Sequence, residues 1–151
     1  MTNSLVKISN LSVDFAVRDG SFRAVDGVSF DLHKNETLAL VGESGSGKSV
    51  TAMSILQLLP RPQATFGSSS SIKFDGNEII DASSADLRKI RGNIISMVFQ
   101  EPMTSLNPYH RVGHQITESI LLHSKKTKTQ AIDEAKDLMK LVEIDDVDRR
   151  F

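Results

Sequence analysis

The segment "GESGSGKS" at Gly42–Ser49 constrains the fold of this chain more than any other, because it fits the phosphate-loop pattern G-x-x-x-x-G-K-[ST]. Such a loop follows a strand and opens a helix. The run "TLALV" at Thr37–Val41 is almost entirely apolar, which predicts a strand buried on both faces. From Lys48 the apolar residues recur at helical spacing until "PRP" at 60–62, which predicts a helix that ends there. The sequence thus predicts a strand, a phosphate loop and a helix in that order.

Each residue type in this loop suits the binding of phosphate. The glycines at positions 42, 45 and 47 allow backbone conformations that a Cβ would forbid, and they let N–H groups approach an anion closely. The start of the following helix adds the positive end of its dipole. We expect Lys48 to bind the terminal phosphates and the hydroxyl of Ser49 to be a ligand of Mg²⁺. The loop therefore predicts a site for a nucleotide and Mg²⁺.

Composition narrows the class of protein. A chain of 151 residues, 39% hydrophobic and 25% charged, is typical of one globular domain. The net charge of -1 gives no electrostatic indication of nucleic acid as a partner. Cysteine is absent, which excludes disulfides and thiolate chemistry. The apolar runs are too short to span a membrane and the N-terminus has no apolar signal region, so we expect a soluble cytoplasmic domain.

Several segments outside the loop have the pattern of strands. Leu5–Phe15 and Ala24–Leu32 alternate apolar and polar residues, with "RDGS" at 18–21 as a turn between them. "SIKFDGNEI" at Ser71–Ile79 reads as strand, turn and strand, with Asp-Gly at the turn. "NIISMVF" at Asn93–Phe99 predicts a second buried strand. The inward positions expected in the first strand are Val6, Ile8, Leu11, Val13 and Phe15.

The last third of the chain is predicted to be largely helical. A short helix is predicted before this part, in "SSADLRKIRG" at Ser83–Gly92. Within it, another helix is predicted at Val112–His123. A longer helix is predicted over Thr127–Glu143, where Thr127 and Gln130 have the spacing of a capping box. Its apolar stripe is expected at Ile132, Ala135, Leu138, Met139 and Val142. We therefore expect a mixed α/β part over residues 1–100 and a helical part over residues 101–151.

The phosphate loop alone does not name a reaction. A Ras-type GTPase needs an Asn-Lys-x-Asp guanine-binding motif and an Asp-x-x-Gly switch, and neither occurs in the sequence. A small phosphotransferase is not excluded in this way, because its acceptor site has no short signature. Its acceptor pocket is not recognisable here.

The two segments "LALVGESGSGKSVTA" and "MVFQEPMTSLNP" together give a specific resemblance. The chain resembles the ATP-binding subunit of an ABC transporter of the oligopeptide and dipeptide importer group over essentially its whole length. Within that group it is most similar to importers of the microcin C or glutathione type. The resemblance implies an α/β P-loop NTPase core with an antiparallel β subdomain and the start of a helical subdomain, truncated.

The resemblance also implies roles for individual residues. Lys48 and Gln100 would be catalytic, with Gln100 as the Q-loop glutamine that contacts Mg²⁺ together with Ser49. Phe15 falls where the family stacks an aromatic ring on adenine, although Phe22 in a neighbouring loop is a rival and a plain core role remains open. The Walker A residues implied to contact ATP are Gly42, Glu43, Ser44, Gly45, Ser46, Gly47, Lys48, Ser49 and Val50.

Partners and location follow from the same resemblance. The loop Glu101–Pro108 would face membrane-spanning permease subunits, and a second nucleotide-binding domain would complete a head-to-tail dimer. Such a protein is peripheral, at the cytoplasmic face of the inner membrane, and its ATPase activity energises peptide import.

Some family motifs do not occur in the sequence. There is no "LSGGQ"-like signature, no apolar Walker B strand ending in Asp-Glu and no later switch histidine. The sequence therefore reads as the front portion of a longer protein that should bind ATP but hardly hydrolyse it alone. A non-catalytic nucleotide-sensing module is the alternative.

Overall fold

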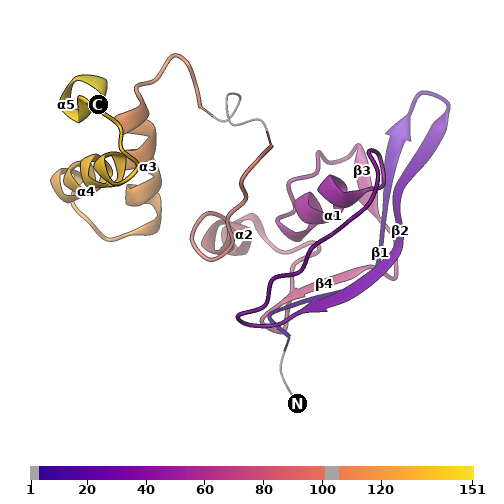
Figure 1. Ribbon diagram of the computed structural model, residues 1–151. Coiled ribbons are helices and arrows are strands. Elements are labelled where there is room, and N and C mark those ends of the chain that lie inside the picture. Colours follow the sequence, from indigo (N-terminus) through magenta and orange to yellow (C-terminus); the bar gives the residue numbers. More distant parts are fainter. Residues whose placement is uncertain (1–3, 101–105) are drawn as a thin grey trace. The chain divides into compact units, whose positions relative to one another are not determined.

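An antiparallel sheet dominates the first part of the computed structural model, which describes residues 4–100 and 106–151 (Figure 1). The chain forms two units, Met1–Leu87 and Arg88–Phe151. In the first unit the strand order is β2-β1-β4-β5, and β3 also pairs with β1. The strands are β1 (Val6–Val17), β2 (Gly20–Leu32), β3 (Ala64–Phe66), β4 (Ser71–Phe74) and β5 (Asn77–Glu78).

Local sequence chemistry explains both hairpins of this sheet. Val17 pairs with Gly20, so the predicted turn is a two-residue connection between β1 and β2. Asp75 and Gly76 both have positive φ, 45° and 80°, as the two central residues of a type I′ turn require. The predicted strands and turns of this region are therefore confirmed. The predicted inward residues of β1 are fully buried except Phe15, which is partly buried against the core.

Helix α1 (Lys48–Ile55) packs on this sheet and forms the second layer of the unit. Its residues Val50, Met53 and Ile55 contact the core cluster of the strands. The helix ends before the predicted stop at Pro60, because Gln57 adopts a left-handed conformation with φ of 51°. The layer that carries the phosphate loop is thus fixed to the sheet by apolar contacts.

The predicted buried strand at Thr37–Val41 is wrong. The segment forms no strand, and its side chains are exposed, with Val41 92% and Leu40 42% accessible. A strand needs a neighbour for its backbone N–H and C=O groups, and burial on both faces also needs a covering layer on each side. Among the described residues, none pairs with this segment. Apolar composition alone therefore does not make it a strand.

The predicted strand at Asn93–Phe99 is wrong for the same physical reason. Its backbone makes an isolated parallel bridge between Arg91 and Ile95, and no named strand forms. Val98 is 95% exposed and Phe99 49% exposed. This segment belongs to the second unit, where the described residues form helices and supply no sheet.

The described helices include α2 (Ser84–Ile90), which spans the division between the units, and three helices of the second unit. These are α3 (Val112–His123), α4 (Lys128–Leu141) and α5 (Val147–Arg150). The predicted helices at these places are confirmed. The predicted division of the chain between residues 100 and 101 falls at the edge of the undescribed residues 101–105 and stays a prediction.

Helix α4 starts with the predicted capping box. The backbone N–H of Gln130 donates to Thr127 Oγ1 at 3.3 Å, and the N–H of Thr127 donates to Gln130 Oε1 at 2.9 Å. These reciprocal bonds satisfy two donors that the helix start would leave unpaired.

The predicted apolar stripe of α4 is partly wrong. The buried residues are Ala131, Ala135 and Met139, whereas Leu138 is 43% exposed and Val142 66% exposed. The buried stripe of α4 is therefore narrower than predicted. Helix α4 packs against α3, whose buried residues, Gly113 and Thr117, are also small.

The carboxylate of Glu78 connects the β4–β5 hairpin to the chain that follows it. Glu78 Oε1 accepts hydrogen bonds from the backbone N–H groups of Ile72, Ile79 and Ile80 at 2.9, 3.1 and 3.0 Å. The hydroxyl of Ser71 donates to Glu78 Oε2. Burial raises the pKa of Glu78, but the hydrogen bonds from Ser71 and the three backbone groups together lower it below its usual value.

We expect Glu78→Gln to destabilise the fold at neutral pH by about 1 kcal/mol, a modest value because solvent screens this side chain. Since the folded pKa of Glu78 is lowered, its stabilisation is present above the unfolded pKa of about 4.3 and is lost as the pH falls through the folded pKa. Urea unfolding at neutral and acidic pH measures both effects. The exposed Glu143→Gln in the second unit is the control. A difference between wild type and Glu78→Gln that does not shrink in acid would contradict this role.

Candidate functional site

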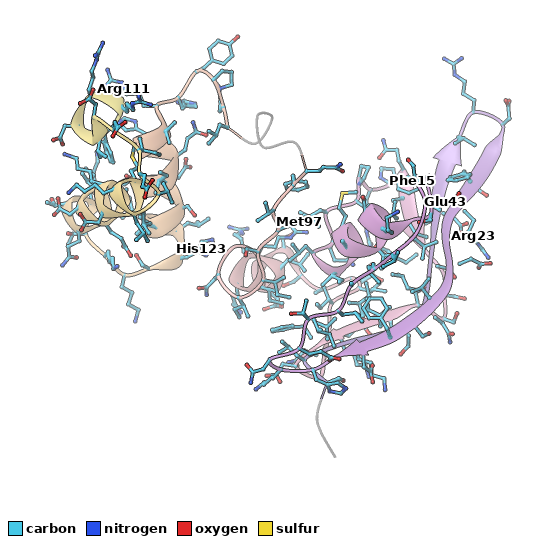
Figure 2. All side chains as sticks on the ribbon, viewed as in Figure 1. Phe15, Arg23, Glu43, Met97, Arg111 and His123 are labelled. Atoms are coloured by element: carbon cyan, nitrogen blue, oxygen red, sulfur yellow. The ribbon has the colours of Figure 1, made fainter. Side chains whose placement is uncertain are left out.

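The loop at Gly42–Ser49 has the backbone that its glycines require. Gly45 and Gly47 lie in the left-handed region, with φ of 83° and 86°. A methyl group added at Gly42 would come within 2.6 Å of Ser46 Oγ, so the loop is closed tightly there. The N–H of Ser46 donates to the carbonyl of Glu43 at 3.2 Å. Figure 2 shows Glu43 in this loop, which connects the segment after β2 to α1.

The Lys48 side chain folds back over the loop that precedes it. Its Nζ donates to the carbonyl oxygens of Gly42 and Glu43 at 2.7 and 2.6 Å, and to Ser46 Oγ at 3.2 Å. The ammonium group is thereby held against the backbone of the loop. A cation in this place can attract an anion that approaches the loop.

The N-terminus of α1 leaves its first backbone donors available. Gly47 is the N-cap and has no side chain to accept from them, and the first turn contains no acidic residue. The Thr51 N–H and hydroxyl both bond to the Gly47 carbonyl, at 2.8 and 3.0 Å, so the helix begins in a regular way. Ser49 is exposed at this end of the helix. The loop and helix start therefore combine free N–H groups, a helix dipole and a cation.

The last glycine of the loop packs against the sheet. A methyl group added at Gly47 would lie 2.5 Å from the carbonyl oxygen of Ala24 and 3.2 Å from Val25 Cγ2. Both residues belong to β2, so the strand backs the start of α1 directly. Neither the motif nor the hydrophobic pattern indicates this contact in advance.

The two aromatic candidates for adenine stacking lie opposite each other on the hairpin. Phe15 of β1 pairs with Phe22 of β2. Side chains directly opposite in a sheet share a face. Phe15 is partly buried against the core cluster and Phe22 is 58% exposed. The assignment of Phe15 to adenine stays a prediction.

The predicted Q-loop is described in part. Gln100 is exposed and belongs to the second unit, where it follows an irregular segment rather than the predicted strand. The predicted permease-facing loop Glu101–Pro108 lies mostly outside the described residues. The roles of Gln100 and of this loop stay predictions.

Comparison with known protein families gives a match over most of the chain. The family profile described as "ABC transporter" matches residues 25–151, which include the loop and α1. This chain belongs to the ABC transporter family.

Curated relatives of this ABC family chain are ATP-binding proteins. It is 42% identical over 148 residues to a probable peptide ABC transporter ATP-binding protein of Sinorhizobium fredii, covering 97% of this chain and 44% of that protein. It is 44% identical over 140 residues to the oligopeptide transport ATP-binding protein OppD of Bacillus subtilis, covering 93% of this chain and 39% of that protein. The chain thus spans less than half the length of these relatives, whose names bear out the predicted peptide-importer resemblance.

A solved ABC structure matches the fold. The ATP-binding cassette MJ0796, solved as a dimer in a post-hydrolysis state bound to ADP and Pi, has a TM-score of 0.76 and 21% sequence identity. The match covers 93% of this chain and 58% of that one. The predicted fold class, an α/β P-loop cassette with an antiparallel β subdomain, is therefore confirmed. None of the helices described in residues 4–100 and 106–151 has the length and hydrophobicity of a membrane span.

The residues of this ABC loop fit the phosphates of a nucleotide. A Cβ at Gly42 would collide with the Ser46 side chain, the N-terminus of α1 has no side-chain cap, and Lys48 Nζ is held by loop carbonyls. The helix N-terminus provides N–H donors and Lys48 provides a positive charge, as the binding of phosphate requires. The hydroxyl of Ser49 is an oxygen donor of the kind that Mg²⁺ accepts.

Proposed function

We propose that this chain is the ATP-binding part of an ABC transporter ATPase that energises the import of peptides. The observation that carries the proposal is the loop itself, where Lys48 Nζ lies 2.7 Å from the Gly42 carbonyl next to an uncapped helix N-terminus. Relatives named as peptide and oligopeptide transport proteins support peptides as the cargo. A cargo of the microcin C or glutathione type is a finer prediction within the same proposal.

ATP supplies the free energy for transport when its terminal phosphate is hydrolysed. The backbone N–H groups of the loop would hold the phosphate oxygens, and Lys48 would offset their negative charge. Ser49 and Gln100 would hold Mg²⁺, and Phe15 would stack on adenine. Residues 1–100 would form the ATP-binding core and residues 101–151 the Q-loop and the first part of a helical subdomain.

Partners would be required for the complete cycle. We propose a second nucleotide-binding domain in a head-to-tail dimer, and the dimeric state of the MJ0796 cassette supports this arrangement. Permease subunits would contact the loop Glu101–Pro108, which would place the protein at the cytoplasmic face of the inner membrane. Nucleic acid has no part in the proposal.

Turnover separates this proposal from its alternative, a module that binds nucleotide without catalysis. A positioned general base contributes to ATP hydrolysis, and the sequence has no run of four apolar residues ending in Asp-Glu to supply one. We therefore propose that these 151 residues alone bind ATP and turn it over very slowly. Phosphate release from the whole protein with its permease would support the ATPase, whereas nucleotide binding without any release would support the sensing module.

Calorimetric titration with ATP, with and without Mg²⁺, tests the binding proposal. For Ser49→Ala we expect the strengthening of ATP binding by Mg²⁺ to fall by about tenfold, because a metal ligand is lost while the N–H groups and Lys48 remain. Ser69→Ala, an exposed loop serine outside the site, is the matched control and should behave as wild type. Equal Mg²⁺ dependence in Ser49→Ala and wild type would refute the metal assignment.

A further inference from the structure

The β1–β2 hairpin is irregular where it passes beneath the phosphate loop. Val13 of β1 pairs with Val25 of β2, but the next residue of β1, Asp14, pairs with Arg23. Ala24 is therefore an extra residue on β2 without a partner on β1 in this register, which is a β-bulge. Bulges bend a strand locally and change where its backbone groups point.

The bulge lies against the last glycine of the phosphate loop. The Ala24 carbonyl oxygen would lie 2.5 Å from a methyl group on Gly47, and Val25 Cγ2 would lie 3.2 Å from it. The contact is made by the backbone of the bulge with a residue that has no side chain to adjust. A shift of the bulge would therefore move Gly47, which is the N-cap of α1.

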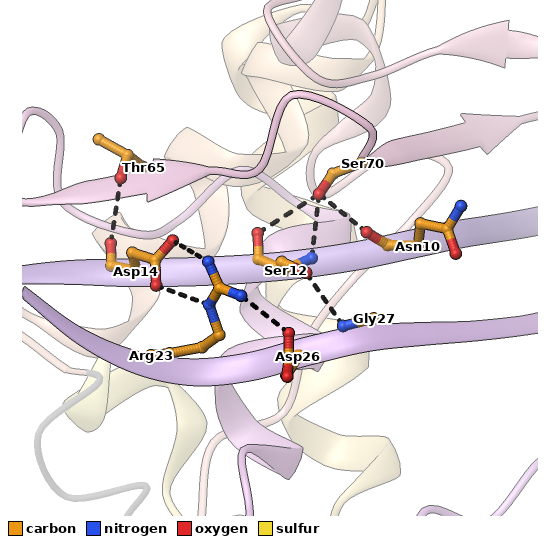
Figure 3. A network of polar contacts seen from close by, with 8 residues as sticks. All are labelled: Asn10, Ser12, Asp14, Arg23, Asp26, Gly27, Thr65 and Ser70. Atoms are coloured by element: carbon orange, nitrogen blue, oxygen red, sulfur yellow. Dashed lines mark hydrogen bonds and ion pairs between the residues drawn. The ribbon is translucent and has the colours of Figure 1, made fainter.

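The Arg23 side chain spans this bulge (Figure 3). Its Nε and Nη2 donate to the two carboxylate oxygens of Asp14 at 2.9 and 3.2 Å, across the strand pair. Its Nη1 donates to Asp26 Oδ1 at 3.0 Å, on the far side of Ala24. The guanidinium thus connects residues on both sides of the bulge with the geometry of a bidentate pair.

The ionisation of Asp14 agrees with this arrangement. The hydrogen bond from Arg23 lowers the pKa of Asp14, burial opposes the effect, and the charge of Arg23 lowers it further. The carboxylate is therefore charged at neutral pH and keeps both oxygens available to the guanidinium.

Neighbouring irregularities of the same hairpin are also held by polar side chains. The N–H of Gly27 donates to Ser12 Oγ at 3.0 Å, and the N–H of Asn10 donates to Ser29 Oγ at 2.8 Å. The hairpin therefore repeatedly uses a side chain of one strand to fix the shifted backbone of the other.

We infer that Arg23 is a positioning residue for the phosphate loop, acting through the Ala24 bulge on Gly47 and the start of α1. Arg23 does not touch the nucleotide in this proposal, which rests on the proposed ATP binding. Its effect is to hold the loop N–H groups in place, so its loss should weaken phosphate binding without removing a phosphate ligand.

The test is Arg23→Gln in the full chain, measured in two ways. We expect the dissociation constant for MgATP to rise about fivefold, as for a residue that acts through coupled packing rather than direct contact. In the absence of nucleotide, we also expect the backbone amide resonance of Gly47 to shift in a ¹H–¹⁵N spectrum. Arg23→Lys keeps the charge but not the bidentate geometry, so its affinity should be intermediate.

Lys7→Gln is the matched control. Lys7 and Asp31 are also cross-strand partners on this hairpin, with Nζ 4.0 Å from Oδ2, but their register is regular and they lie away from the bulge. This variant should leave the affinity for MgATP and the Gly47 resonance unchanged. If Lys7→Gln weakened binding as much as Arg23→Gln, a general loosening of the hairpin would replace the inference.

The two proposals fail in different ways. If wild type did not bind MgATP, the proposed function would fall, and the Gly47 resonance recorded without nucleotide would still decide the inference. If Arg23→Gln bound MgATP as wild type does and left that resonance in place, the inference would be overturned while ATP binding stood.

Discussion

Lys48→Ala should lose about a hundredfold in affinity for MgATP, because the cation that would offset the charge of the phosphates is removed. The Lys48 ammonium is already at the loop, where it bonds to the carbonyls of Gly42 and Glu43. Little side-chain ordering is therefore needed when a phosphate arrives. Titration calorimetry or displacement of a fluorescent ATP analogue measures the loss.

The Lys48→Ala variant needs a control for loop order, because it also loses the hydrogen bonds from Lys48 to the loop. Lys48 also stabilises the loop without nucleotide, so thermal unfolding of Lys48→Ala separates a disordered loop from a missing cation. Lys34→Ala, an exposed lysine after β2, should bind MgATP as wild type does. Unchanged MgATP affinity in Lys48→Ala would remove the phosphate loop from the proposed function.

The predictions that were confirmed depend on short-range chemistry. The turn at Asp75 and Gly76 needs positive φ at both residues, and the sequence places there two residue types that accept it. The capping box of Thr127 and Gln130 is likewise complete within four consecutive residues. Strand β1 alternates because one of its faces is covered by the core of its own unit. In each case the interactions that decide the structure lie close in sequence or within one unit.

The predictions that were wrong depend on neighbours that a sequence pattern does not identify. The apolar runs at Thr37–Val41 and Asn93–Phe99 resemble buried strands, but the described residues give neither run a strand neighbour. Hydrophobicity reports what a segment can bury, whereas a strand also needs paired backbone groups. The predicted stripe of α4 was wrong in a similar way, since Leu138 and Val142 are apolar yet exposed.

The residues of the candidate site could be predicted from the sequence, but the contacts that hold the loop against β2 could not. The motif identifies the glycines, Lys48 and Ser49, because phosphate chemistry demands those types at that spacing. Its support by the Ala24 bulge was not predicted, since hydrophobic alternation does not identify which residues of β1 and β2 pair with each other. Arg23 between Asp14 and Asp26 looks like an ordinary surface charge cluster until the pairing of β1 and β2 is known.

Gly47→Ala should destabilise the first unit by about 3 kcal/mol and abolish measurable MgATP binding. Two costs add at this position. The φ of 86° is unfavourable for any residue with a Cβ, and the added methyl group would meet the Ala24 carbonyl at 2.5 Å. Because that oxygen belongs to the backbone of β2, it cannot rotate away as a side chain could. Urea unfolding followed by circular dichroism measures the loss of stability.

Gly45→Ala separates the two costs of the Gly47 substitution. Gly45 has nearly the same φ, 83°, but an added methyl group would find nothing within 4 Å. Gly45→Ala should therefore lower the free energy of unfolding by about 1 kcal/mol, which is the cost of the backbone conformation alone. The difference between the variants then measures the contact of the phosphate loop with the β2 bulge. If both glycines cost the same, the loop does not rest on Ala24, and the path from Arg23 to the phosphate loop would have no physical basis.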